Sequence, residues 1–109
     1  MTNVVVILTT VPDSGRADEL ARALVDERLA ACVNVHAPMT STYRWKDAVE
    51  REPECQLVIK TTRDRIGAVE ARLRQLHPYE LPEFLVLPVE HGSDAYVRWV
   101  NESADAGTR

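Results

Sequence analysis

The sequence has no excess of basic residues. Its 109 residues include 13 Lys and Arg against 17 Asp and Glu, which gives a formal net charge of −4. Proteins that bind nucleic acids or anionic membranes draw much of their affinity from Lys and Arg that lie near phosphate groups. We therefore expect neither a nucleic-acid partner nor a membrane partner.

Cysteine is also scarce. Cys32 and Cys55 are the two cysteines, and they form no CxxC pair. A chain of this length buries roughly two-thirds of its unfolded surface, so it needs no disulfide scaffold. The N-terminal segment has no basic leader, and its apolar run is too short to span a membrane. These features predict a cytoplasmic protein.

Glycine occurs four times, and no phosphate-binding glycine loop is present. The GxSxG motif of serine hydrolases is absent, and neither cysteine lies in a context that would activate a thiolate. We therefore expect a protein that is not an enzyme and that requires no cofactor.

What the chain does contain is a regular alternation of strand and helix patterns. β-branched and apolar runs predict strands over about 4–10, 30–45, 48–62 and 83–91. Apolar residues at spacings of three and four predict helices over about 17–29 and 66–76, and a short helix after Ser93. The order β-α-β-β-α-β predicts an α+β fold with a ferredoxin-like antiparallel sheet and a closing C-terminal helix. Residues 1–109 form a single domain, with a flexible tail expected over about 102–109.

The prolines predict the order of the strands. Proline is tolerated mainly at sheet edges or bulges because it cannot donate a backbone hydrogen bond. Pro38 falls within the second predicted strand and Pro88 within the fourth, whereas the apolar runs of the first and third strands contain none. The first and third strands should therefore be central.

The second and third strands predict a very long hairpin. Together they run from about residue 31 to residue 62, far longer than a usual pair of strands of five or six residues each. Lys46 and Asp47 lie at the reversal, and Tyr43 and Trp45 share one face near the tip. Long open edges and exposed aromatic rings favour association. We therefore expect a closed homo-oligomer in which each hairpin packs on a neighbouring copy.

Two groups of side chains could bind a metal. Cys32 and His36 share one strand face, but residues four apart on a strand are about 13 Å apart, so one ion cannot join them within a subunit. The second group is His77 and His91 with the acids Glu80, Glu83 and Glu90, for metal binding or acid–base chemistry. The alternative is that these are solvated loop side chains, and no HxH, HExxH or CxxC motif favours the metal.

Four segments together resemble a known family. "ERLAACVNV", "STYRWKDAVEREPECQLVIKT", "HPYELPEFLVLPVEHG" and "YVRWVN" occur in the order and spacing of the CutA divalent-cation tolerance proteins. The resemblance covers the chain from about residue 4 to residue 101. It implies a ferredoxin-like homotrimer, related in architecture to PII-type signalling proteins, whose bacterial members are linked to tolerance of copper and other divalent metals.

The sequence departs from the copper-associated members of that family. Those members have a cysteine in the first strand and paired histidines before Pro-Tyr, whereas Thr9 and the pair Leu76 and His77 stand here. The departure removes a thiolate and one imidazole, which argues against tight binding of Cu(I). Asp47 stands where the family usually has glycine, and because aspartate is among the few other residues that tolerate a left-handed turn position, we expect such a turn there.

The resemblance also implies a site in clefts between subunits. The matching positions with polar or aromatic side chains are Cys32, Tyr43, Trp45, Glu54, Lys60, His77 and Tyr79. We hypothesise a small-ligand or metal site there, the metal being a divalent ion such as copper, with His77 and Glu54 as ligands and Lys60 as an anion contact. Two functions stay open: divalent-metal tolerance or response to metal ion, and a PII-like regulatory module that binds a small anionic metabolite between subunits.

Overall fold

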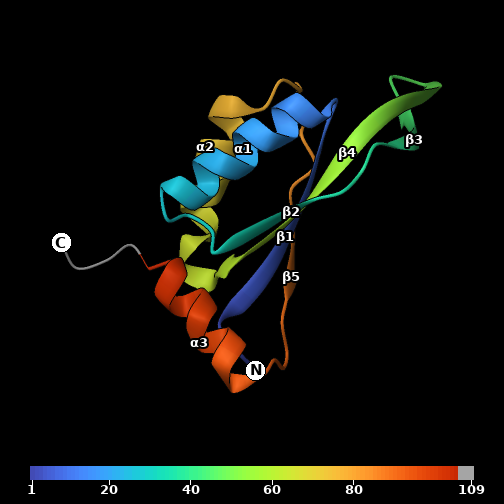
Figure 1. Cartoon of the computed structure of the whole chain (residues 1–109). Helices are drawn as coiled ribbons and strands as arrows, with labels where there is room; N and C mark the ends of the chain where they lie inside the picture. Colours follow the sequence, from blue (N-terminus) through green and yellow to red (C-terminus); the bar gives the residue numbers. More distant parts are fainter. Residues whose placement is uncertain (106–109) are drawn as a thin grey trace.

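The computed structural model describes residues 1–105 (Figure 1). Its elements follow the predicted order of a ferredoxin-like α+β fold, with the second predicted strand divided in two. Along the chain they are β1 (Val4–Val11), α1 (Ser14–Asp26), β2 (Cys32–Val35), β3 (Met39–Trp45), β4 (Ala48–Thr62), the 3-10 helix η1 (Arg63–Arg65), α2 (Ile66–Leu76), β5 (Leu85–Pro88) and α3 (Asp94–Ser103).

Local signals fix the helix ends. The carboxylate of Asp13 accepts a hydrogen bond from the N–H of Arg16 at 2.8 Å, so it caps the start of α1. Ser93 caps α3 in the same way. α2 ends at Leu76 because Pro78 disfavours a helical conformation for the residue before it and cannot continue the helix.

The sheet has the predicted strand order. β2, β4, β1 and β5 lie side by side in that order, every neighbouring pair is antiparallel, and β3 pairs with β4. The central positions of β1 and β4 are confirmed. Pro88 lies in the outer strand β5 as expected, but the placement of Pro38 within a strand is wrong: it lies between β2 and β3. Proline removes a ladder hydrogen bond, so the strand breaks there.

One face of the sheet packs on α1 and α2. Alternate residues of the central strands point to this side, and Val5, Ile7, Leu57 and Ile59 are completely buried in the main core. At one end of the sheet Val4, which points to the opposite face, packs with residues of α3 in a second, smaller cluster. The two clusters hold the central strands from both sides.

The middle of that opposite face, beside β5, is partly open. Leu85 and Leu87 of β5 pair with Leu8 and Val6 of β1, so the four side chains lie on one face. Leu85 is 55% exposed and Leu87 is 48% exposed. An apolar sheet face with this exposure is typical of a surface that another chain covers.

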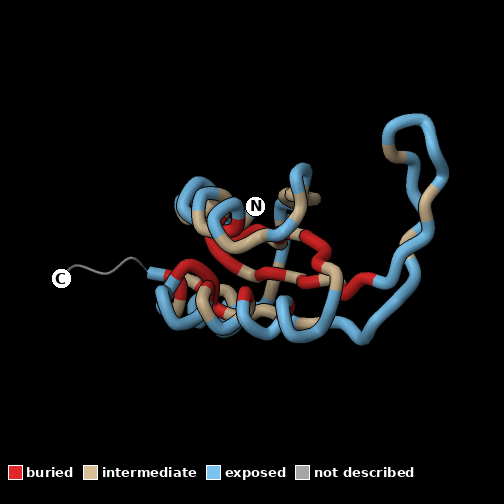
Figure 2. Tube along the Cα trace, turned by 90° about the horizontal axis from the view of Figure 1, so that it is seen from above, coloured by how far each residue is buried: buried red, intermediate tan, exposed pale blue. Residues whose placement is uncertain are grey.

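The long hairpin forms an arm that projects from the body. We define the arm as residues 39–54, which comprise β3 and the first half of β4 paired from Met39↔Glu54 to Trp45↔Ala48. Figure 2 shows it extending away from the buried core with most of its length exposed. Lys46 and Asp47 at its tip both have positive φ, 50° and 68°, which confirms the predicted left-handed turn.

The predicted start of the C-terminal tail, at about residue 102, is too early. α3 continues through Ser103, and Ala104 is buried in the cluster with Val4 and Val100. Because Ala104 packs against these valines, the ordered packing continues to at least residue 104. The rest of the predicted tail, residues 106–109, lies outside the described residues.

Candidate functional site

A cavity of about 800 Å³ lies where the arm meets the body. Its walls come from the end of β1, from the arm, and from the proline-rich segment between α2 and β5. It is lined by Thr10, Met39, Ser41, Thr42, Tyr43, Trp45, Glu54, Gln56, Pro78, Tyr79, Glu80, Leu81, Pro82 and Glu83. Three of these side chains are carboxylates, three are aromatic, and none is Lys or Arg. We call this cavity the arm cleft.

A chain of hydrogen bonds fixes one wall of the arm cleft. The hydroxyl of Tyr79 donates to the carboxylate of Glu54 at 2.7 Å. Glu54 lies at the base of the arm and is only 9% exposed, so the bond joins a buried anion to the segment that follows α2. Such charge-assisted bonds are stronger than bonds between neutral groups. The bond therefore ties the arm to the body.

His77 positions Tyr79. Its Nε2 lies 2.7 Å from the backbone oxygen of Thr10, and its Nδ1 accepts a hydrogen bond from the N–H of Tyr79 at 3.2 Å. A carbonyl oxygen only accepts, so Nε2 carries the proton and Nδ1 carries the lone pair. The neutral ring, 4.9 Å from the Tyr79 ring, thus uses both nitrogens within its own chain.

Burial and charge shift the pKa values of four groups around the cleft, and that of Tyr43 is raised by partial burial and by the charges of Glu52, Glu50 and Glu54. Burial lowers the pKa of the His77 imidazole, against the opposing effects of the Thr10 carbonyl and the Glu54 carboxylate. Burial, followed by the bond to Glu54, raises the pKa of Tyr79 well above its ordinary value. Burial and the negative charge of Glu54 raise the pKa of Glu83. The charge of Glu54 thus disfavours additional negative charge at Tyr79 and Glu83, whereas the positive charge of Arg16 contributes to the lowered pKa of His77.

One oxygen of Glu83 lacks a partner. Its Oε2 is buried without a hydrogen bond among the described residues. A buried carboxylate oxygen without a donor is costly, so a proton donor or cation that reached it after a small side-chain movement would be stabilising.

Most of the predicted site residues meet here. Tyr43, Trp45, Glu54 and Tyr79 line the arm cleft, and His77 lies directly behind Tyr79.

The other two predicted residues lie elsewhere. Cys32 pairs with Lys60 across β2 and β4, and neither lines the cleft. Lys60 is six residues along β4 from Glu54, which corresponds to about 20 Å of strand.

The sequence interpretation missed several lining residues. Thr10 and Gln56 were not selected, although they are the register partners Thr10↔Gln56 on the two central strands. Glu83 was named only within a loose acidic group. The run of prolines around it was the signal, because prolines hold a loop in a fixed, extended shape against the strands.

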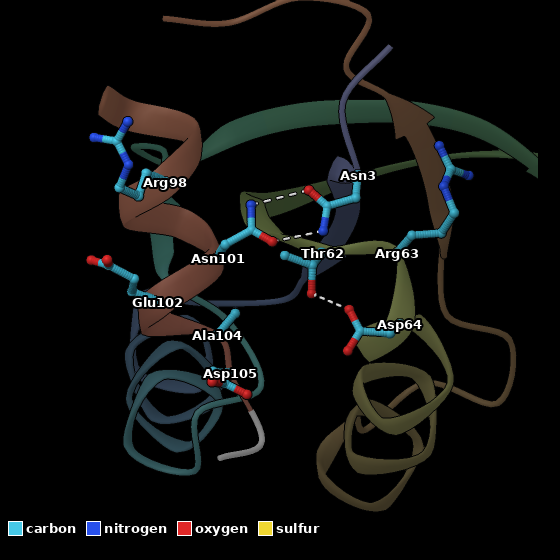
Figure 3. Close-up of a pocket in the computed structure, with 9 residues that line it drawn as sticks. All are labelled: Asn3, Thr62, Arg63, Asp64, Arg98, Asn101, Glu102, Ala104 and Asp105. Atoms are coloured by element: carbon cyan, nitrogen blue, oxygen red, sulfur yellow. Dashed lines mark hydrogen bonds between the residues drawn. The ribbon is translucent and has the colours of Figure 1, made fainter. Parts of the chain in front are cut away.

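A second cavity, of about 740 Å³, lies at the other end of β4 (Figure 3). Asn3 and Asn101 face each other there and exchange two amide hydrogen bonds, of 2.6 and 3.0 Å, while Thr62 donates to Asp64 at 2.6 Å. None of the predicted site residues lies in this cavity. The amide pair joins the N-terminal segment to α3, which gives it a structural role.

Within residues 1–105, no group of three or more His, Cys, Asp or Glu side chains is placed to hold a metal ion. The same residues contain no helix that is both long enough and apolar enough to cross a membrane.

Together the fold and the cleft define a small ferredoxin-like α+β protein whose acidic, aromatic cleft lies at the base of a projecting hairpin. Residues 5–103 match the family described as CutA1 divalent ion tolerance protein, and the chain belongs to that family.

Individual relatives agree in sequence and structure. The divalent-cation tolerance protein CutA of Thermus thermophilus is 43% identical over 98 residues, which cover 90% of this chain and 95% of that protein. The crystal structure of CutA from Xylella fastidiosa superposes with a TM-score of 0.93 at 42% identity and covers 95% of this chain and 100% of that one. A CutA from Archaeoglobus fulgidus, described as a periplasmic divalent cation tolerance protein, superposes with a TM-score of 0.90 at 27% identity, covering 94% and 99%.

Proposed function

We propose that this chain acts in divalent-cation tolerance as a cytoplasmic homotrimer that catalyses no reaction. The observation that carries the proposal is membership of the CutA1 family over residues 5–103, combined with a cleft that is lined by carboxylates and by no basic side chain. Such a cleft attracts cations and repels anions.

The open surfaces of a single chain support the assembly. Leu85 and Leu87 present apolar area on the uncovered sheet face, and Tyr43 and Val49 on the arm are 41% and 63% exposed. β2 and β5 are both edge strands. A closed ring would cover the open face and the edges together, and the number three follows from the resemblance to the family.

His77 and Glu54 are the proposed metal ligands, for an ion such as copper or zinc. One oxygen of Glu54 accepts from Tyr79, and the Nδ1 lone pair of His77 is used by the Tyr79 N–H. Metal binding by His77 therefore requires the bond to the Tyr79 backbone to open. Two ligands are too few for a stable site, so the remaining ligands must come from water or from a neighbouring copy.

The alternative is a PII-like module that binds a small anionic metabolite between subunits. The charge of the arm cleft argues against it, because Glu54, Glu80 and Glu83 line the cleft while Lys60 lies outside it. No lining residue is basic, and the ammonium group nearest to a lining side chain is that of Lys46, over the Trp45 ring.

The assembly is tested by light scattering with size-exclusion chromatography. The chain should elute as a trimer, and Leu87→Lys should dissociate it because a charge would be buried against a second apolar face. Glu90→Lys, at an exposed position three residues further along, is the control and should leave the mass unchanged. A monomeric wild-type chain at micromolar concentration would contradict the assembly.

Ligand binding is tested by thermal shift and calorimetry with Cu(II), Zn(II) and a panel of nucleotides. Stabilisation by a metal that is lost in His77→Ala and Glu54→Gln, but kept in the exposed control His91→Ala, supports the metal site. A response to a nucleotide alone would favour the regulatory module. Cell fractionation tests the cytoplasmic location, since one relative is described as periplasmic.

A further inference from the structure

The arm cleft is far larger than a metal ion requires. A volume of about 800 Å³ lies within the range of cavities that hold small organic molecules. A metal ion with its ligands needs a convergent group of donors, and no such group of three or more His, Cys, Asp or Glu exists among residues 1–105. The size of the cleft therefore leaves room for a second kind of ligand.

The lining combines two kinds of side chain that recognise organic cations. Trp45, Tyr43 and Tyr79 supply aromatic rings, whose faces attract ammonium groups, and Met39 and Leu81 add apolar area for an alkyl chain. The carboxylates of Glu54 and Glu83 supply the opposite charge. Nζ of Lys46 lies over the Trp45 ring, 5.5 Å from its centroid, so a ligand must use the other face of the ring or displace this side chain.

Glu83 adds a second observation, because it holds one of the three buried side-chain polar atoms that lack a partner among residues 1–105. Its Oε2 is buried without a hydrogen-bond donor among residues 1–105, in a carboxylate that also experiences the charge of Glu54. An ammonium group placed between the two would donate to the unpartnered oxygen and offset the repulsion. A bound anion would increase the repulsion.

We infer that the arm cleft binds an organic ammonium ion, with the carboxylates of Glu83 and Glu54 on its charge and the ring of Trp45 against its face. The ligand class is an aliphatic amine or a quaternary ammonium ion with a short alkyl chain. The inference shares its cleft with the proposed metal function but does not depend on metal binding.

Isothermal titration calorimetry of the intact protein tests this, with putrescine and tetramethylammonium as probes in about 150 mM NaCl to screen surface attraction. We expect saturable binding of at least one probe. Glu83→Gln should weaken it by about 10-fold, because a charge-assisted bond is lost, and Trp45→Leu by a similar factor. Glu90→Gln, an exposed carboxylate outside the cleft, should bind as the wild type does.

Three results would overturn the inference: no binding of either probe, binding that Glu83→Gln and Trp45→Leu leave unchanged, or a crystal structure of the assembled protein with a Lys or Arg of a neighbouring copy in the cleft. Circular dichroism on each variant excludes unfolding as the cause.

Zn(II) titration of the same proteins separates the two proposals. Metal binding without probe binding refutes this inference alone, and probe binding without metal binding refutes only the metal function.

Discussion

The bond between Tyr79 and Glu54 should contribute measurably to stability. Tyr79→Phe removes one hydroxyl and leaves the ring in place, so the carboxylate of Glu54 loses its donor at 2.7 Å while it remains only 9% exposed. Hydrogen bonds to charged groups contribute about 1.5–3 kcal/mol. Because Tyr79 lies on the wall of an open cleft, we expect the lower end, about 1.5 kcal/mol.

The assay is thermal and urea unfolding at one fixed protein concentration, since assembly makes the midpoint depend on concentration. For a domain of this length, about 1.5 kcal/mol corresponds to a fall in Tm of roughly 6–10 °C. Tyr43→Phe is the matched control: its hydroxyl lies on a 41% exposed residue, so the change should stay within about 0.5 kcal/mol.

A double-mutant cycle identifies the cause. If the hydroxyl acts through Glu54, Tyr79→Phe should cost about 1 kcal/mol less in a Glu54→Gln background than in the wild type. Equal costs in both backgrounds, or a Tyr79→Phe variant as stable as the wild type, would refute the argument that this bond holds the arm to the body.

Three further predictions concern pH and local structure. Burial lowers the pKa of His77 in the folded state below its ordinary 6.5, so the unfolded chain binds more protons just below that pH. The free energy of unfolding should therefore fall as the pH drops through 6.5. His77→Gln should flatten this dependence in urea unfolding measured at about pH 5 to 8. Asp47, with φ 68°, should be replaced by Gly without loss and by Val at a cost of about 1–2 kcal/mol in urea unfolding, whereas equal effects would contradict the left-handed turn. Asp13→Ala should lose about 1 kcal/mol by removing the cap of α1, and Asp13→Ser should restore most of it.

The sequence predicted the elements and their order well because each has a local cause. β-branched runs marked the central strands, apolar spacing marked α1 and α2, and Asp13, Ser93 and Pro78 marked helix ends. Pro38 and Pro88 correctly predicted that the segments containing them lie at the outside of the sheet. Pro38, however, lies between β2 and β3 and not within one strand.

The site was predicted less completely because its contacts join distant segments. Tyr79 and Glu54 are 25 residues apart, and their bond depends on how the segment after α2 folds back onto the arm. His77 was selected as a histidine before Pro-Tyr, but no pattern indicates that both ring nitrogens bond to backbone groups. Lys60 matched the family and still lies far from Glu54, because distance along an extended strand separates them.

By itself the sequence determined the α+β order, the central and outer strands, the left-handed turn at Asp47 and the family, because propensity, periodicity and motif spacing are properties of short stretches of chain. Only the tertiary structure determined which side chains share the arm cleft, that Glu83 holds a buried oxygen without a donor among residues 1–105, and that one apolar sheet face is partly open. These depend on the packing of segments that are remote in sequence, where a shift of one residue in register would turn each side chain to the other face.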